Sequence, residues 1–181
     1  MAQSIHDFHD DPRNADILVW VNGELKPRAE AVVSVFDSGF VLGDGVWEGL
    51  RVVDGHPAFL DQHLDRLYEG AKAIALDIGL DRAALTRAID DTLAANGMRD
   101  GAHLRLMATR GVKRTPYQDP RASVGPATIV IIPEFKVAKP ETLAAGLRLF
   151  TVHVRRGYPD VQDPKLNSHS KLNCITACIQ A

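Results

Sequence analysis

The sequence predicts an α+β fold with a small N-terminal two-layer domain over residues 1–138 and part of a second domain over residues 139–181. Three observations lead to this prediction. The chain opens with short apolar segments joined by hairpin-type turns, and two amphipathic helices and two further apolar strands follow. Residues 133–140 then interrupt the pattern with two prolines and three charged side chains, which is typical of a domain boundary.

The strands are predicted from apolar runs and the turns between them. Residues 1–15 are expected to form a loose arm, residues 17–21 a strand, Asn22-Gly23 a hairpin turn and residues 31–36 the return of the chain. A second hairpin is predicted from a strand over residues 50–53, the turn Asp54-Gly55 and a return at residues 58–59. Strands over residues 103–109 and 128–132 flank a long loop over residues 111–126.

Two helices have the strongest local signals in the chain. Apolar residues recur at helical spacing from Leu60 to Ile78, and Gly79 is expected to end that helix. Asp81 is the predicted N-cap of a second helix that runs to Ala95. The second domain is predicted to begin with a strand over residues 147–154 and a polar loop over residues 157–167. A helix over residues 170–181 follows.

One strand and one helix cannot bury their apolar faces alone. We therefore expect a further part of the second domain that this chain lacks. Packing of residues 141–181 back onto the first domain is the alternative.

The bulk composition excludes some classes of function. A net charge of −2 argues against a nucleic-acid partner. The sequence contains no run of about 18 apolar residues, so no membrane span is predicted. The polar N-terminus has no apolar signal core, so a cytosolic location is expected. Cys174 and Cys178 are expected to be buried thiols, and the seven histidines show no paired metal-ligand spacing, so no metal is predicted.

Three arginines are candidate anion ligands. Glycine-rich residues 37–45 precede the strand that carries Arg51, an arrangement that suits a phosphate site. Strand alternation places His103 and Arg105 on one face, with Arg110 at the strand end, where two guanidinium groups could hold a carboxylate. From base rates alone, solvated surface arginines are the better explanation of these positions.

Lys171 is the candidate nucleophile. It opens the last predicted helix, where the positive end of the helix dipole disfavours the ammonium form and lowers the pKa of the side chain. A neutral amine can attack an aldehyde, so this position suits a lysine that bonds covalently to a carbonyl cofactor. A lysine in a first helical turn is more often simply exposed, and Lys165 is a nearby competitor.

Three segments together resemble the class IV aminotransferases of the branched-chain and D-amino-acid family. Residues 39–51, Gly-Phe-Val-Leu-Gly-Asp-Gly-Val-Trp-Glu-Gly-Leu-Arg, are similar to the family's glycine-rich signature. Residues 59–67, with their His-x-x-Arg-Leu, resemble its helix-opening pattern, and residues 109–111, Thr-Arg-Gly, resemble a strand end of the D-amino-acid branch. The resemblance implies pyridoxal 5'-phosphate as cofactor. It also implies fold type IV, with residues 139–181 as the first strand and helix of a larger pseudo-barrel domain.

The resemblance also implies roles for single residues. Arg51 falls on the arginine that holds the cofactor phosphate, and Lys171 on the lysine that bonds to the cofactor. Phe40 and His103 fall on residues of the substrate pocket, and Arg105 and Arg110 on residues that grip a substrate carboxylate. Asn173 follows Lys171 by two residues, whereas the family usually has three or more, so Lys165 is kept as the alternative lysine. The acidic partner of the pyridine nitrogen is expected beyond residue 181.

The implied function is amino-group transfer between a branched-chain or D-amino acid and a 2-oxo acid, with Lys171 moving the proton. Aminodeoxychorismate lyase and R-selective amine transaminase activities are alternatives on the same fold, and an inactive fragment is a third. Family members pair as homodimers, so a dimer is expected.

Overall fold

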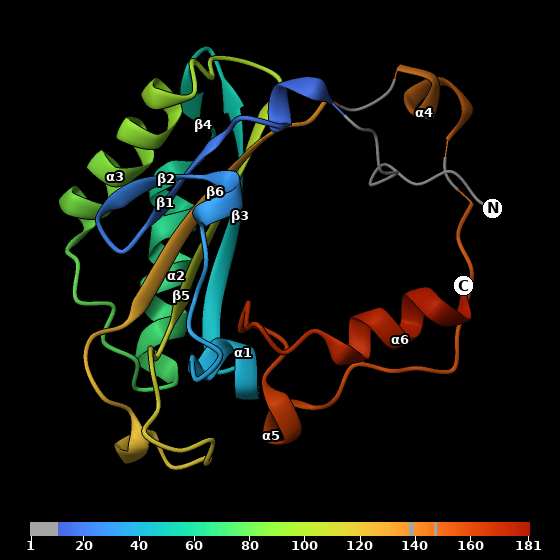
Figure 1. Ribbon diagram of the computed structural model, residues 1–181. Coiled ribbons are helices and arrows are strands. Elements are labelled where there is room, and N and C mark those ends of the chain that lie inside the picture. Colours follow the sequence, from blue (N-terminus) through green and yellow to red (C-terminus); the bar gives the residue numbers. More distant parts are fainter. Residues whose placement is uncertain (1–10, 138–139, 147) are drawn as a thin grey trace.

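The computed structural model describes residues 11–137, 140–146 and 148–181, and its centre is one six-stranded antiparallel sheet. The strand order is β2-β1-β6-β5-β3-β4. The strands are β1 (Leu18–Val21), β2 (Glu24–Pro27), β3 (Gly45–Val53), β4 (His56–Pro57), β5 (Ala102–Thr109) and β6 (Thr128–Phe135). The helices α2 (Leu60–Ala73) and α3 (Arg82–Ala95) cover one face of this sheet, and the C-terminal segment lies on the other side (Figure 1).

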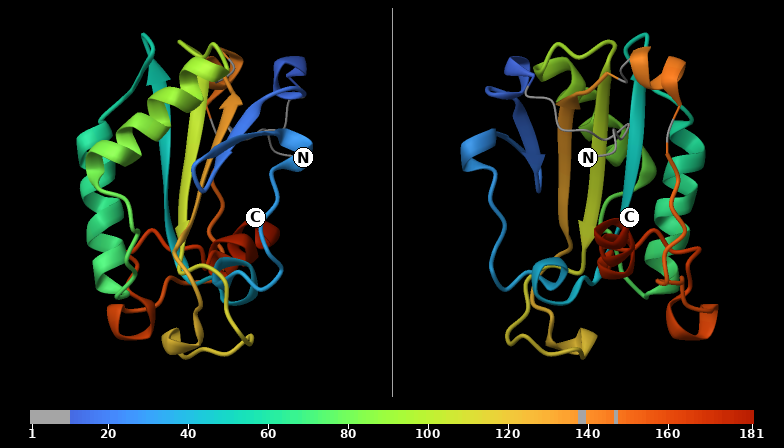
Figure 2. Two further views of the ribbon diagram at one scale, coloured as in Figure 1. Left: turned by 60° about the vertical axis from the view of Figure 1, so that its left-hand side comes forward. Right: turned by 90° about the vertical axis from the view of Figure 1, so that its right-hand side faces the viewer.

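Shorter helical segments complete the described chain. They are α1 (Ser38–Leu42), α4 (Pro140–Ala145), α5 (Pro159–Gln162), α6 (Leu172–Gln180) and the 3-10 turns η1 (Pro12–Asn14), η2 (Arg28–Glu30) and η3 (Pro120–Ala122). In the two turned views, α5 and α6 lie toward the end of the sheet at which α1 lies (Figure 2). No helix in the described ranges has the length and apolar character that crossing a bilayer requires.

The two central strands show why this sheet has one dry face and one open face. On β5, Leu104, Leu106 and Ala108 are fully buried against the helices, and His103 and Arg105 point the other way. The predicted alternation of this strand is therefore confirmed. β3 pairs with β5 along eight positions, from Gly45 opposite Thr109 to Val52 opposite Ala102.

Both long helices bury an apolar stripe, as their spacing predicts. Leu64, Leu67 and Ala71 of α2 are buried, and the Asp81 side chain caps α3 by accepting a hydrogen bond from the Ala84 amide at 2.7 Å. The predicted start of α3 is confirmed. The predicted end of α2 at Gly79 is wrong, because Ala75 adopts φ 50° and the helix stops at Ala73. The helix was predicted too long because Leu76 and Ile78, which lie beyond its end, are also buried in the core and continue the apolar spacing.

Four strand predictions are wrong. Residues 31–36 form no strand, because β2 already returns along β1. β3 begins at Gly45 and not at residue 50, and β4 occupies His56–Pro57 instead of residues 58–59. Residues 148–154, the described part of the strand predicted over 147–154, have no strand partner, and α4 precedes them. A strand needs a neighbour to pair its backbone, and the described residues place none beside this segment.

The ends of the chain also differ from the predictions. Asn14 of η1, within the predicted arm over residues 1–15, is buried. Its side-chain oxygen accepts a hydrogen bond from the Phe135 amide at 2.8 Å, and its side-chain nitrogen donates to the Phe135 carbonyl at 3.0 Å. The predicted boundary between residues 138 and 139 lies outside the described residues. Cys174 and Cys178 are exposed, contrary to the prediction, since α6 presents Leu172, Ile175 and Ile179 to solvent without a partner among the described residues.

Candidate active site

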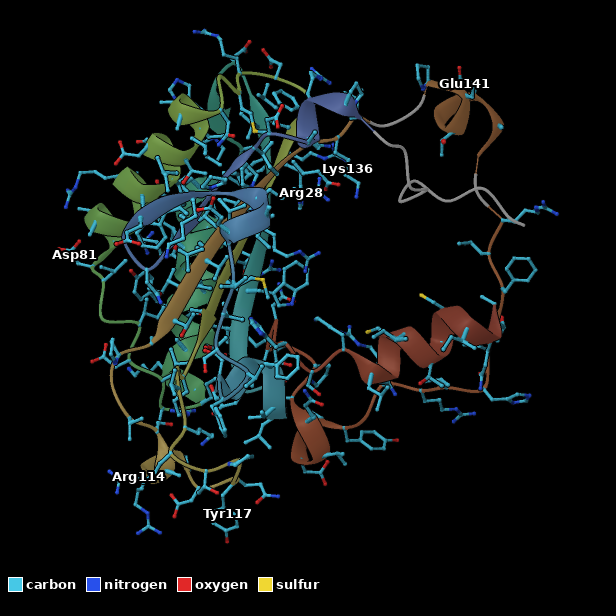
Figure 3. The ribbon with its side chains drawn as sticks, in the orientation of Figure 1. Arg28, Asp81, Arg114, Tyr117, Lys136 and Glu141 are labelled. Atoms are coloured by element: carbon cyan, nitrogen blue, oxygen red, sulfur yellow. The ribbon has the colours of Figure 1, made fainter. Side chains whose placement is uncertain are left out.

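A cavity of about 570 Å³ lies on the sheet face that the long helices leave open. This volume lies within the range of roughly 300–1,000 Å³ that is usual for small-molecule sites. Arg28 and Lys136, labelled in Figure 3, lie close together at one end of it. The residues around it come mainly from β3, β5 and β6, and they include Trp47, Gly49, Arg51, Arg66, His103, Arg105, Ile132, Glu134 and Asn167.

The charge of this cavity favours an anion. Five of its lining residues are cationic, namely Arg28, Arg51, Arg66, Arg105 and Lys136, whereas Asp11 and Glu134 are the two acidic ones. Walls of one sign raise the local concentration of the opposite sign. A ligand with one or more phosphate or carboxylate groups is therefore the chemical class that this cavity attracts.

Arg51 stands at the end of the cavity near Lys136. Its side chain is exposed on the open face of β3, and Nη1 donates a hydrogen bond to the Lys136 carbonyl at 2.9 Å. This bond occupies one of the five N–H donors of a guanidinium group. The anchored side chain keeps donors for a phosphate or carboxylate.

Glycine at position 49 lets His103 approach the floor of the cavity. A Cβ added to Gly49 would lie 3.0 Å from the His103 Nε2 atom. Burial, the largest cause, together with the charges of Arg51, Arg105 and Lys136, lowers the pKa of His103 to about 4, and Glu134 opposes the shift. His103 is therefore neutral at pH 7 and adds a hydrogen-bonding ring without further positive charge.

Arg105 stacks on the indole of Trp47. Its guanidinium carbon lies 4.1 Å from the ring centroid, within the range of a cation–π contact. The Trp47 ring is itself held by a 3.1 Å hydrogen bond from Nε1 to the Ser168 carbonyl. The stack fixes Arg105 over the middle of the cavity floor.

Residues 167–169 bring the C-terminal segment to the free edge of β3. The Trp47 amide donates to the Asn167 carbonyl at 2.9 Å, and the His169 amide donates to the Gly45 carbonyl at 3.0 Å. His169 packs over Gly39 and Gly45, where added Cβ atoms would lie 3.1 and 3.3 Å from its ring. These three residues contact the first domain, whereas Leu172, Ile175 and Ile179, the apolar residues that the alternative would bury there, stay exposed.

Lys171 follows this edge contact and points its amine at the cavity wall. Nζ donates to the Asn167 Oδ1 atom at 3.0 Å and lies 5.1 Å from the Trp47 ring centroid. Partial burial is the main cause that lowers the pKa of Lys171 below its ordinary value. Arg156, Arg105 and Arg66 act in the same direction, and Cys174 opposes them.

Lys171 itself lines a smaller cavity beside α6, and three further residues expected at the site lie outside the basic cavity. Arg110 uses its guanidinium to hold Asp44, at 2.7 and 3.0 Å, and the carbonyls of Ile74 and Ala75, both at 2.7 Å. Phe40 lies on α1 and is 71% exposed. Lys165 is exposed, and it lines neither this cavity nor the smaller one beside α6.

The Thr-Arg-Gly segment has a clear structural role instead. The Thr109 hydroxyl donates to the buried Asp37 carboxylate at 2.9 Å, and Asp37 in turn accepts from the Gly39 amide at 2.8 Å. Arg110 joins Asp44 to the end of α2. These contacts tie the strand end to the glycine-rich segment, which explains why both motifs occur together.

Reasoning from the sequence missed two groups of residues that shape the cavity. Asn167 lines it and contacts Lys171, but a single asparagine in a polar loop carries no pattern. Arg66 reaches it from α2 while its guanidinium grips the fully buried Glu48, with contacts of 2.7 and 2.5 Å. His63 adds a third contact to Glu48 at 2.7 Å. The His-x-x-Arg spacing on one helix face was the signal that could have found this cluster.

Comparison with known proteins identifies the family. The model of the family described as amino-transferase class IV matches residues 45–181. The chain belongs to this family. It is 41% identical over 170 residues to branched-chain-amino-acid aminotransferase-like protein 1 of Arabidopsis thaliana, covering 94% of this chain and 30% of that protein.

An archaeal relative and a solved structure agree with this membership. A putative branched-chain-amino-acid aminotransferase of Methanocaldococcus jannaschii is 41% identical over 164 residues, which cover 90% of this chain and 55% of that protein. The branched-chain aminotransferase of Thermoproteus uzoniensis, solved with norvaline, superposes with a TM-score of 0.78 at 26% identity. That match covers 92% of this chain and 56% of the solved chain. The class IV chain described here thus spans between about a third and just over half of the length of these relatives.

Proposed function

We propose that this class IV chain belongs to an enzyme that transfers an amino group between an amino acid and a 2-oxo acid with pyridoxal 5'-phosphate. One observation carries the proposal. The basic cavity that holds the Arg51 guanidinium is also lined by Asn167, and Asn167 accepts a hydrogen bond from the Lys171 amine, whose pKa is lowered. The names of the relatives support a branched-chain amino acid as the donor, with D-alanine aminotransferases among the more distant matches.

The residues present fit the cofactor. Arg51 would hold the phosphate, because its side chain lies in the cavity with donors to spare. Arg51 lies four positions after Trp47, beside which Lys171 lies, a span of about 13 Å along β3. Gly49 in between presents no side chain, and the rings of His103 and Trp47 take up the space that a Cβ there would need. When bound, pyridoxal phosphate supplies an aldehyde and an electron-withdrawing ring.

Lys171 would carry the proton in this reaction. A partly buried amine with a lowered pKa is neutral in a larger fraction of molecules, so it can accept a proton from the α-carbon of an amino acid and later return one. The Trp47 ring shields one side of the amine from solvent. Lys165 is the weaker candidate because it is exposed, whereas Lys171 is half-buried and contacts Asn167 of the cavity wall.

Arg105 and His103 would orient the substrate. Arg105 lies over the cavity floor and presents a guanidinium to a carboxylate, which favours amino acids and 2-oxo acids over simple amines. Neutral His103 beside it can donate or accept one hydrogen bond. Arg110 and Phe40 are not included in the proposed site because they lie outside the cavity.

A homodimer and a reducing compartment belong to the same proposal. Val32, Val35 and Phe40 are 73%, 66% and 71% exposed in one short segment, an apolar surface that association would cover. The exposed thiols of Cys174 and Cys178 suit the reducing cytosol.

Borohydride trapping tests the proposed function. The chain is mixed with pyridoxal phosphate, reduced and digested, and the peptide that carries the pyridoxyl group is identified by mass spectrometry. We expect the group on Lys171, and a Lys171→Gln variant should lose it while Lys165→Gln keeps it. Labelling of Lys165 alone would move the role to that residue, and no specific labelling of the folded chain would refute the proposal.

A further inference from the structure

Asn167 is fastened by hydrogen bonds between the sheet and the last helix. Its carbonyl accepts from the Trp47 amide at 2.9 Å, and its Nδ2 donates to the Trp47 carbonyl at 2.6 Å. With the amide nitrogen held in this way, the side-chain oxygen has a fixed direction. That oxygen accepts from the Lys171 Nζ atom at 3.0 Å, and Asn167 itself lines the cavity.

Lys171 has no other side-chain oxygen within hydrogen-bond distance among the described residues. Its second neighbour is the Trp47 ring at 5.1 Å. Lys171 precedes α6, and a flexible four-carbon side chain at such a position points into solvent unless a partner holds it. Asn167 is that partner, because it lies four residues before Lys171 on the wall of the cavity.

We propose that Asn167 is a positioning residue that aims the Lys171 amine at the Trp47 ring, beside the basic cavity. A neutral amide suits this task better than a carboxylate would. An aspartate in its place would hold the amine equally near but would stabilise its charged form, which cannot act as a nucleophile or base. The significance for catalysis rests on the proposed function, whereas the contact itself can be tested without a cofactor.

The charged and titratable groups around Lys171 come from several elements. Arg66 of α2 and Arg105 of β5 face it from the sheet side, Arg156 from the segment before α5, and Cys174 from α6. His169 lies two residues away, and burial lowers its pKa, which leaves its ring neutral at pH 7. Because this set holds more cations than anions, it lowers the pKa of the Lys171 amine as long as Asn167 holds the amine among these groups.

Competitive labelling of the full chain with trace acetic anhydride tests the inference. Only the neutral amine reacts, so the pH dependence of labelling at each lysine, read by mass spectrometry, reports its titration midpoint. Exposed Lys165 serves as the internal reference, and Lys113, only 2% exposed, stays unlabelled while the domain is folded. The variants are Asn167→Asp and Asn167→Ala.

The matched control is Asn173→Asp. It adds the same charge within the first turn of α6, but the Asn173 side chain donates to the Arg155 carbonyl and does not contact Lys171. The titration midpoint of Lys171 is expected to be lowest in the wild type, higher in Asn167→Ala and highest in Asn167→Asp. For Asn167→Asp the midpoint should rise by about one unit or more, which slows labelling near pH 8 about tenfold. Asn173→Asp should change this rate less than about twofold.

The order of the variants separates positioning from a general structural role. If the amine stayed in place without Asn167, loss of the acceptor would lower its midpoint below that of the wild type, and this result would overturn the inference. Equal effects of Asn167→Asp and Asn173→Asp would overturn it as well. If the expected order is found but borohydride trapping leaves Lys171 unmodified, the proposed function fails and the positioning contact stands.

Discussion

At the scale of single residues, His103 shows how the cavity sets the charge of its own wall. Burial and three neighbouring cations lower the pKa of His103 from 6.5 to about 4. Between these two values the unfolded chain binds a proton that the folded chain does not. The free energy of unfolding therefore decreases as the pH falls from about 6.5 to 4, and each unit of pKa difference corresponds to about 1.4 kcal/mol.

A His103→Gln variant should lose much of this pH dependence, since glutamine does not titrate. Urea unfolding at pH 7 and pH 5 measures the difference for the wild type and for the variant. His56→Gln is the control, because His56 lies exposed on β4 away from the cavity. If His103→Gln retains the full difference between pH 7 and pH 5, His103 is not the titrating group.

At the scale of elements, the start of β3 depends on the absence of a side chain. A Cβ added to Gly45 would lie 2.6 Å from the Ala108 carbonyl oxygen and 3.1 Å from the Thr109 Cα atom. Both are backbone atoms of the paired strand, so they cannot rotate away. Glycine at this position lets β3 and β5 approach closely and also makes room for the His169 ring.

A Gly45→Ala variant should therefore unfold at lower urea concentration, with a loss of about 2–3 kcal/mol, the upper part of the range for overpacking. Gly157→Ala is the matched control. The added Cβ would there meet the exposed Val161 side chain at 3.3 Å, which can move, and the change should cost less than about 0.5 kcal/mol. Equal stability of the two variants would show that the two strands can separate without cost.

The same strand shows which elements the sequence could predict. α3 and β5 were predicted closely because the Asp81 cap and the alternation of Leu104 and Leu106 are local signals. The first residues of β3 were missed because their glycines read as a turn. They form a strand through β5 and residues 167–169, partners that lie 60 or more positions away. Residues 148–154 show the converse: apolar residues there predicted a strand, but no other strand among the described residues pairs with them.

At the scale of the whole molecule, the cavity collects side chains from the sheet, a helix and the C-terminal segment. Alternation predicted that His103 and Arg105 share one face of their strand, and the pairing of β3 with β5 brings Arg51 beside them. It could not predict Asn167 or Arg66, whose places depend on long-range packing. Alternation also could not show that the Arg110 guanidinium donates its hydrogen bonds to Asp44 and to two backbone carbonyls.

The cavity predicts that cofactor binding stabilises this chain. At a pyridoxal phosphate concentration 100 times its Kd, the free energy of unfolding should rise by about 2.7 kcal/mol, which raises the Tm by about 5–10 °C. Pyridoxal, which lacks the phosphate, should give a smaller shift at equal concentration. In an Arg51→Gln variant the two compounds should act alike, and a persistent advantage of the phosphate would place its site elsewhere.

The contact between Trp47 and residues 167–169 also has a consequence during synthesis. The partners are 120 positions apart, so β3 emerges from the ribosome long before the segment that covers its edge. At about 5–20 residues per second the delay is about 6 to 24 s. Throughout this interval the nascent chain displays unpaired backbone groups at Gly45 and Trp47, an opening for association with another nascent chain or for protection by a chaperone.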